Sequence, residues 1–194
     1  MSRIYFATSN KEKLLIAKTV CNQSGIDVEQ ILVDINEIQG EDPRIIIEDK
    51  VKQAYKKVLK PIVVSDDSWD IPSLKGFPGP YMKSINQWFE PQDFIRLMHG
   101  IKDRTIILHQ YLAYYDGQCL RIFSNRIHGE IVSEPRGMNN NSPNMSVIAL
   151  EQDNSLTLAE VFERQDYELK KRYLTRPDVW SKFIKWYQIV GLVK

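Results

Sequence analysis

Cysteine is scarce in this sequence. The two copies, Cys21 and Cys119, lie far apart, and neither belongs to a Cys-x-x-Cys pair or a Cys/His cluster. We therefore expect two reduced thiols and no zinc site. Long apolar stretches are also missing, since no run approaches the roughly 18 residues that a membrane span needs. The N-terminal MSRIYFATSN lacks the apolar core of a signal peptide, so the expected location is the cytoplasm.

A surplus of charge of one sign is lacking as well. The formal net charge of +1 argues against a large nucleic-acid-binding surface. What is present is a globular composition, with 43% hydrophobic and 10% aromatic residues in a chain of 194 residues. That length is enough to bury one sizeable core. We therefore expect one domain over residues 1–194 that binds neither nucleic acid nor membranes.

The most informative stretch is 62–81, IVVSDDSWDIPSLKGFPGPY. Its first residues, 62–64, are typical of a strand buried on both faces, and we expect that strand to end at Ser65-Asp66-Asp67-Ser68. Adjacent carboxylates there cost desolvation unless a cation or a donor binds them. In α/β sheets, ligands bind at the carboxyl ends of strands. An exposed acidic turn is the alternative. The Gly/Pro-rich remainder is typical of a loop.

Hydrophobic periodicity predicts the other elements. The expected strands are 3–7, 31–33, 62–65, 105–115, 118–132 and 145–150, with a type I′ turn at Asp116-Gly117. The expected helices include 14–18 and cover 44–59, 91–99, 156–173 and 179–187. This order predicts an α/β fold, an elongated mixed β-sheet flanked by helices, in two lobes with a central cleft.

A possible anion site precedes the first helix. Thr8, Ser9 and Asn10 are good N-cap types, and a helix N-terminus presents free N–H groups and partial positive charge. Lys13 in the first turn opposes the helix dipole, which is understandable if an anion binds there. An ordinary capped helix is the alternative. His99, His109 and His128 have no motif spacing, and we expect structural roles for them.

Several segments resemble the inosine triphosphate pyrophosphatase (Ham1-like) family. The matching segments are a T-x-N-x-x-K opening at 8–13, an E-x-Q-G segment at 37–40, a D-D-[ST] signature at 66–68 and an L-x-G-x-P-G-x-Y segment at 74–81. The stretch 127–137, IHGEIVSEPRG, is similar to the family's G-x-I-x-x-P-R-G stretch. They follow one another in the family's order. The resemblance implies an elongated mixed sheet in two lobes, a homodimer, and Mg²⁺-dependent cleavage of a nucleoside triphosphate such as ITP, dITP or XTP to monophosphate and pyrophosphate.

The resemblance also implies roles for individual residues. The phosphate-binding side chains would be Thr8, Asn10, Lys13, Lys50 and Ser68. Glu37 and Asp67 would bind Mg²⁺, which prefers hard oxygen ligands. Asp67 would also orient or deprotonate the attacking water, with Asp66 supporting the cation and Lys50 counted among the catalytic residues. An apolar surface near Trp88 and Phe89 would serve the dimer.

Two family features are missing, and both concern the base. The family's aromatic-Gly-aromatic-Asp-Pro loop is replaced after Gly137 by Met-Asn-Asn-Asn-Ser-Pro, so Ser142 stands for the aspartate. The family's Ser-His-Arg triplet corresponds to Lys170-Lys171-Arg172, and an earlier family lysine falls on Asp166. We expect Ser142, Lys171 and Arg172 to face the substrate and the base preference to be altered or relaxed. A catalytically weak, nucleotide-binding paralogue is the alternative.

Overall fold

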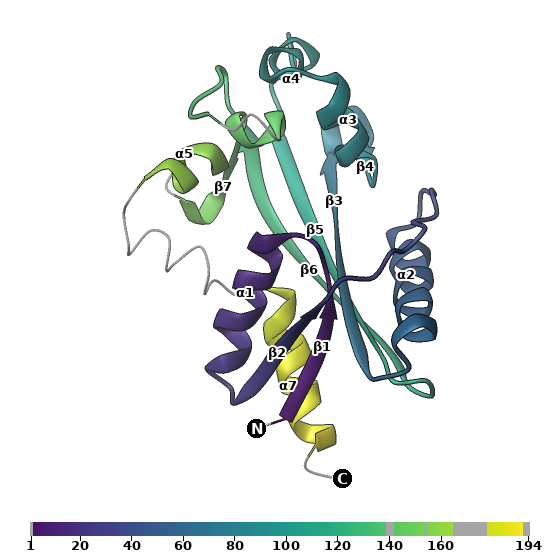
Figure 1. The fold of residues 1–194 in the computed structure, drawn as a ribbon. Coiled ribbons are helices and arrows are strands. Elements are labelled where there is room, and N and C mark those ends of the chain that lie inside the picture. The colour runs from purple at the N-terminus through teal and green to yellow at the C-terminus, as the bar shows by residue number, and fades with distance from the viewer. Residues whose placement is uncertain (1, 139–141, 154, 165–177, 192–194) are drawn as a thin grey trace. The chain divides into compact units, whose positions relative to one another are not determined.

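The computed structural model describes residues 2–138, 142–153, 155–164 and 178–191 (Figure 1). The strands are β1 Ser2–Ala7, β2 Ile26–Ile31, β3 Ile62–Ile71, β4 Phe77–Gly79, β5 Thr105–Tyr115, β6 Leu120–Ile131 and β7 Ile148–Leu150. The α-helices are α1 Lys11–Asn22, α2 Pro43–Val58, α3 Met82–Trp88, α4 Pro91–Leu97, α5 Leu158–Glu163 and α7 Val179–Gly191. Short 3₁₀ turns are η1 Pro72–Leu74, η2 Pro143–Ser146 and η3 Glu151–Asp153. None of the described helices is long and apolar enough to cross a membrane.

The strands form one mixed sheet. In the described residues seven strands take the order β2-β1-β3-β5-β6-β7, with β4 beside β3. β1 pairs in parallel with β2 and β3, whereas β4 is antiparallel to β3 and β7 is antiparallel to β6. Helices flank this sheet (Figure 1). The predicted α/β class with a mixed sheet is therefore confirmed.

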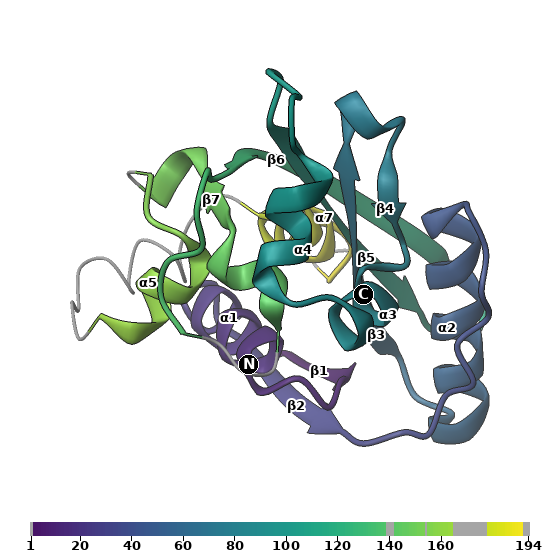
Figure 2. The same cartoon turned by 90° about the horizontal axis from the view of Figure 1, so that it is seen from above.

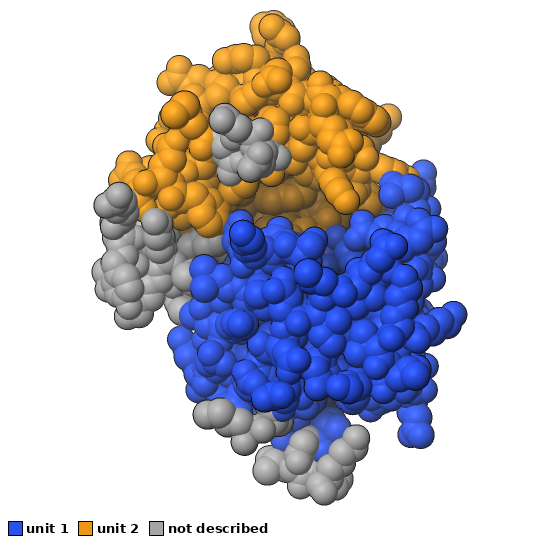
Figure 3. Space-filling model, in the orientation of Figure 1, with its two compact units in different colours: residues 1–66, 110–125, 174–194 blue, residues 67–109, 126–173 orange. Residues whose placement is uncertain are grey.

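The chain forms two compact units (Figure 3). The first contains residues 1–66, 110–125 and 174–194, and the second contains 67–109 and 126–173. The boundaries at 66/67, 109/110 and 125/126 fall within the strands β3, β5 and β6, so each of these strands has residues in both units. A single domain over the whole chain stays a prediction.

The first unit has helices on both sides of its strands (Figures 1 and 2). On one side α1 and α7 pack on Ile4 and Phe6 of β1, with Phe183 of α7 fully buried. On the other side α2 packs on Ile62 and Val64 of β3. Since successive strand residues point to opposite faces, burial of both faces explains why β3 begins with an unbroken apolar run.

The second unit contains the remainder of the three shared strands together with β4, β7 and the helices α3, α4 and α5. Its buried side chains include Phe94 of α4, Met98 directly after α4, and Ile106 and Leu108 of β5. The 3₁₀ turn η2 contacts both α4 and α5. This turn therefore links the two helices to the end of the segment that follows Gly137.

The second strand differs from its prediction. The expected strand was the apolar run 31–33, but β2 ends at Ile31 and Leu32 is 74% exposed. β2 instead pairs residue by residue with β1, from Ser2 opposite Ile26 to Ala7 opposite Ile31. An alternating pattern with buried Ile26 and Val28 marks this strand, and a search for contiguous apolar residues overlooks it.

The central strand is longer than predicted. β3 continues through Ser65-Asp66-Asp67-Ser68 to Ile71, so the two carboxylates lie in the middle of a strand and not at its end. Trp69 and Ile71 are buried, and the expected loop after them contains β4, in which Phe77 pairs with Ile71. Pairing with β4 thus extends β3 past the polar residues. An acidic turn is excluded.

Other boundaries also moved. The predicted type I′ turn is wrong, because it requires positive φ at both central residues and only Gly117 of the pair has it, at 96°. Four residues, 116–119, connect β5 to β6, and the Asp116 carboxylate accepts hydrogen bonds from the N–H groups of Gln118 and Cys119. Helix α3 was not predicted, and the expected strand 145–150 shortens to β7 because η2 occupies its start. Of the expected helix 156–173, the described part is α5, and 165–173 lies outside the described residues.

Candidate active site

The start of α1 brings Thr8, Asn10 and Lys13 together. Asn10 is the N-cap, and its Oδ1 accepts hydrogen bonds from the N–H groups of Glu12 at 2.9 Å and Lys13 at 3.0 Å. The hydroxyl of Thr8 accepts from the N–H of Asn10 at 3.1 Å. Two of the helix's first N–H groups are therefore used by the cap itself. An anion here would find donors in the Asn10 amide group, the Thr8 hydroxyl hydrogen and the Lys13 ammonium.

A second group surrounds Lys50 of α2. Its Nζ lies 2.6 Å from Glu37 Oε1 and 3.6 Å from Asp66 Oδ2. The Lys50 side chain is only 13% exposed, whereas the two carboxylates are 38% and 32% exposed. An ammonium group this buried needs compensating charge, and the structure provides it from a loop and from the central strand. Sequence analysis assigned these three residues to one site, and the structure brings them into contact.

The carboxylates beside Lys50 offer oxygen ligands of the kind that Mg²⁺ prefers. In the described residues no set of three or more His, Cys, Asp or Glu side chains could hold a metal ion by itself. Mg²⁺, however, is often held by one or two carboxylates together with substrate phosphates and water. The oxygens of Glu37 and Asp66 converge on one cation, Lys50, and so have the donor chemistry and charge that such an ion requires. Glu37 and Asp66 therefore fit a Mg²⁺ ion whose other ligands are phosphate oxygens and water. The sequence predicted Asp67, the residue after Asp66, as the second carboxylate ligand.

The remaining predicted residues are more dispersed. Asp67 follows Asp66 along β3 and is half-buried, and Ser68 is buried at 3% exposure. Ser142 is half-buried directly before η2, where its carbonyl accepts a hydrogen bond from the N–H of Met145. Lys171 and Arg172, together with Asp166, Lys170 and Asn139, Asn140 and Asn141, lie outside the described residues.

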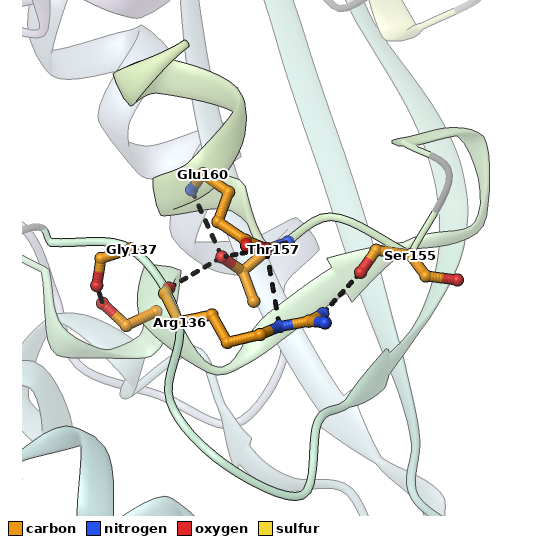
Figure 4. A network of polar contacts seen from close by, with 6 residues as sticks. Arg136, Gly137, Ser155, Thr157 and Glu160 are labelled. Carbon is orange, nitrogen blue, oxygen red and sulfur yellow. Dashed lines mark hydrogen bonds and ion pairs between the residues drawn. The ribbon is translucent and has the colours of Figure 1, made fainter.

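The Pro-Arg-Gly turn is fixed to the start of α5 (Figure 4). Thr157, fully buried, donates from Oγ1 to the carbonyl of Arg136 at 2.8 Å and accepts from the N–H of Glu160 at 3.2 Å. The Glu160 carboxylate accepts from the N–H of Thr157 at 2.9 Å and lies 3.5 Å from Arg136 Nε. The Arg136 guanidinium also donates to the carbonyl of Ser155 at 2.5 Å. The arginine of this motif therefore holds a turn in place.

Sequence analysis missed this anchor, although its signal is present. Thr157 and Glu160 form a capping box, the Thr-x-x-Glu pattern that marks a helix N-terminus. The anchor extends to Met138, whose N–H donates to the Glu163 carboxylate at 2.5 Å. It therefore orients the first residue of the segment in which the base-reading aromatics of the family are missing.

His109 belongs to a separate polar cluster in the second unit. Its Nε2 lies 2.9 Å from Asp70 Oδ2, a neighbour from β3. Burial lowers the pKa of His109, and the positive charge of Arg126 and neighbouring His128 act in the same direction, whereas Asp70 opposes them. The imidazole is thus held toward its neutral form.

The sequence matches a known protein family over most of its length. The model of the Ham1 family matches residues 4–178. The chain is 33% identical over 135 residues to a dITP/XTP pyrophosphatase from Thermococcus kodakarensis, covering 70% of this chain and 73% of the relative. It is 31% identical over 138 residues to an inosine triphosphate pyrophosphatase from Tuber melanosporum, covering 69% and 73%.

A solved structure has the same fold. The HAM1 protein from Coxiella burnetii superposes with a TM-score of 0.75, covers 97% of this chain and 99% of its own, and shares 19% sequence identity. The family match spans most of the chain and includes both the start of α1 and the group around Lys50. This chain belongs to the Ham1 family.

Proposed function

We propose that the chain is a Mg²⁺-dependent pyrophosphohydrolase that cleaves a nucleoside triphosphate to its monophosphate and pyrophosphate. It is an enzyme, a hydrolase that acts on nucleoside triphosphates. The observation that carries the proposal is the contact of Lys50 with Glu37 and Asp66 in a chain of the Ham1 family. A triphosphate with its Mg²⁺ ion can use both kinds of group, because an ammonium binds phosphate oxygens and carboxylates bind the ion.

Each residue has a proposed role. Thr8, Asn10 and Lys13 bind phosphate oxygens at the start of α1, and Lys50 and Ser68 add a cation and a hydroxyl. Glu37 and Asp67 would hold Mg²⁺, and Asp66 supports its charge. When bound, this ion would neutralise phosphate charge and favour attack by water. Asp67 accepts the proton of the water that attacks the α-phosphorus. The bond from that phosphorus to the bridging oxygen breaks, and pyrophosphate leaves.

The base side of the site is proposed to be permissive. The names of the relatives specify dITP, XTP and inosine triphosphate, and these purine nucleotides are candidate substrates for this chain. The family's stacking aromatics are absent after Gly137, and Ser142, Lys171 and Arg172 are the proposed substrate contacts on this side. A flexible lysine discriminates among bases less well than a fixed guanidinium fork. We also propose that the protein is a homodimer and is located in the cytoplasm.

One observation favours a second candidate, a catalytically weak nucleotide-binding protein. The segment Met138–Pro143 has lost every aromatic residue of the family's base-reading loop. Stacking of a base on an aromatic side chain is worth about 1–3 kcal/mol in single-strand binders, so this loss could weaken binding substantially. The T-x-N-x-x-K segment with the proposed phosphate-binding residues Thr8, Asn10 and Lys13 is retained, which supports the enzyme.

The test is release of pyrophosphate from a panel of ribo- and deoxyribonucleoside triphosphates, with and without Mg²⁺. We expect turnover of at least one triphosphate and a kcat/KM ratio for ITP over ATP below about 100, because polar-edge recognition that is intact gives about 10⁴ or more. Nucleotide binding without turnover of any triphosphate would establish the second candidate. A preference for ITP above about 1,000 would show that other residues read the base.

A further inference from the structure

The segment before the E-x-Q-G motif lies along helix α2. Residues 32–40 have no regular secondary structure, and Glu37 and Ile38 in it are exposed. Three side chains of α2 nevertheless hold this segment in order: Lys57 donates to the carbonyl of Asp34, Gln53 contacts the backbone of Asn36, and Lys50 pairs with the carboxylate of Glu37. The residue numbers rise along the segment as they fall along the helix. The segment therefore runs antiparallel to α2.

The spacing of the three contacts is in register. From Lys50 to Lys57 the helix rises about 10.5 Å, at 1.5 Å per residue. From Asp34 to Glu37 an extended chain advances about 10 Å, at roughly 3.3 Å per residue. Helix and segment thus match over their common length, and each contact can form without distorting the others. Side chains of α2 therefore bind this extended segment at regular intervals, as a neighbouring strand would.

Gln53 makes the central and most specific of these contacts. Its Oε1 accepts from the N–H of Asn36 at 3.2 Å, and its Nε2 donates to the carbonyl of the same residue at 2.8 Å. The second hydrogen of Nε2 goes to Asp49 Oδ2 at 2.5 Å. A carboxylate accepts only from the nitrogen end of the amide, so Asp49 fixes which way the amide faces. Both donors and the acceptor of the Gln53 amide are therefore used.

We propose that Gln53 is a positioning residue for Glu37. By pairing with both backbone groups of Asn36, it fixes the residue directly before Glu37 and so places the carboxylate next to Lys50 and the bound cation. The effect on catalysis rests on the proposed function, whereas the effect on the segment does not. Because both the N–H and the carbonyl of Asn36 are bonded to Gln53, this residue cannot shift along the helix. Loss of the amide therefore frees Glu37 to leave its position even though Lys50 remains.

The test uses a substitution that keeps the shape of Gln53 and removes its hydrogen bonds. Gln53→Met is nearly isosteric, and Lys56→Met places the same side chain at an exposed position of the same helix as a matched control. Amide hydrogen exchange is measured on peptides that cover 32–40, without nucleotide or metal. Two hydrogen bonds are lost, so exchange of this segment should be roughly tenfold faster in Gln53→Met and unchanged in Lys56→Met. A thermal melt of each variant confirms that the whole fold is retained.

The second readout is the Mg²⁺ concentration that gives half of the maximal rate. In Gln53→Met this concentration should rise roughly tenfold, whereas Lys56→Met should behave as wild type. Unchanged exchange of 32–40 in a folded Gln53→Met variant would overturn the proposal, as would faster exchange with an unchanged Mg²⁺ requirement. If wild type hydrolyses no triphosphate, the proposed function fails. The hydrogen-exchange comparison then decides alone whether Gln53 holds the segment.

Discussion

Lys50 pairs with two carboxylates of the first unit. Its ammonium lies between oxygens of Glu37 and Asp66, in a position where only 13% of its side chain is exposed. Removing one partner of a buried ion pair costs far more than removing a surface charge, because the other charge stays buried and unpaired. The three residues therefore act as a unit, and each substitution among them is expected to change the others' environment.

Substitution of Asp67 tests the proposed chemistry most directly. Asp67→Asn keeps the size of the side chain and removes its charge and its ability to accept a proton. We expect kcat to fall by at least 10²–10³-fold, the range typical for loss of one charged or polar group that stabilises a transition state. Asp27→Asn, which removes a carboxylate from an exposed ion pair with Arg3, is the matched control. Turnover within tenfold of wild type in a folded Asp67→Asn protein would contradict the role.

His109 should make stability depend on pH. Burial is the main cause of its lowered pKa, and the groups facing it are Asp70 from β3 and Arg126 and His128 from β6. Below the ordinary value of 6.5, the unfolded chain takes up a proton that the folded chain resists. The free energy of unfolding should therefore be highest above this value and fall as the pH drops toward the lowered pKa.

The pH effect can be measured by urea unfolding at pH 7.5, 6.5 and 5.5. His109→Gln should show a smaller loss of unfolding free energy across this range than wild type. His99→Gln, at an exposed position, should keep the wild-type slope. Equal slopes for wild type and His109→Gln would show that other groups determine the acid sensitivity.

At the scale of elements, the capping box of α5 both starts a helix and holds a turn. Thr157 caps the helix and bonds to the carbonyl of Arg136, while Gly137 packs directly on the first turn of the same helix. A Cβ atom added to Gly137 would lie 2.7 Å from the backbone nitrogen of Glu160 and 2.9 Å from Cβ of Ala159. These contacts involve a backbone atom and a short side chain, so neither can move aside easily.

Two glycines with the same backbone angle separate the cost of strain from the cost of crowding. Gly25 and Gly137 both have φ of 72°, but a Cβ atom at Gly25 would meet nothing within 4 Å. Gly25→Ala should lower the free energy of unfolding by about 1–2 kcal/mol through backbone strain alone. Gly137→Ala should cost about 1–3 kcal/mol more, because it also overpacks the turn against α5. Equal losses in chemical denaturation would mean that the turn can move away from the helix.

At the scale of the whole molecule, the exposed aromatic residue of α3 is the notable surface feature. Trp88 is 71% exposed, although tryptophan is large and mostly apolar. Tryptophan is enriched at protein–protein interfaces. Neighbouring Phe89 is half-buried and packs edge-on against Phe94, with ring centroids 5.2 Å apart. An exposed aromatic side chain next to well-packed residues is well suited to a subunit interface.

We predict a homodimer, with light scattering at micromolar concentration giving twice the chain mass of 22.7 kDa. Trp88→Glu should shift the mass toward the monomer, because it places a charge in the expected interface. Leu32→Glu, at a position that is 74% exposed in the other unit, should leave the mass unchanged. A wild-type mass near 22.7 kDa would refute the prediction.

The sequence by itself was sufficient for the fold class, the order of most elements and the members of the group around Lys50. Amphipathic periodicity places α2 within one residue of its prediction, because a regular buried face at helical spacing leaves little choice. The motif segments contain Glu37 and Asp66, and the need for a second cation beside a triphosphate pointed to Lys50 of the neighbouring helix. The Ham1 resemblance was likewise visible in the sequence and is confirmed by the family match.

Only the tertiary structure decided where strands end and which side chains hold the loops. β3 passes through two carboxylates because β4 pairs with its far end, and no local preference of Ser-Asp-Asp-Ser predicts such pairing. The bonds from Gln53 to Asn36 join residues 17 apart in the chain, and those from Thr157 to Arg136 join residues 21 apart. Contacts between segments that are distant in the chain depend on how helices and strands pack. Periodicity, which describes one segment at a time, contains no information about them.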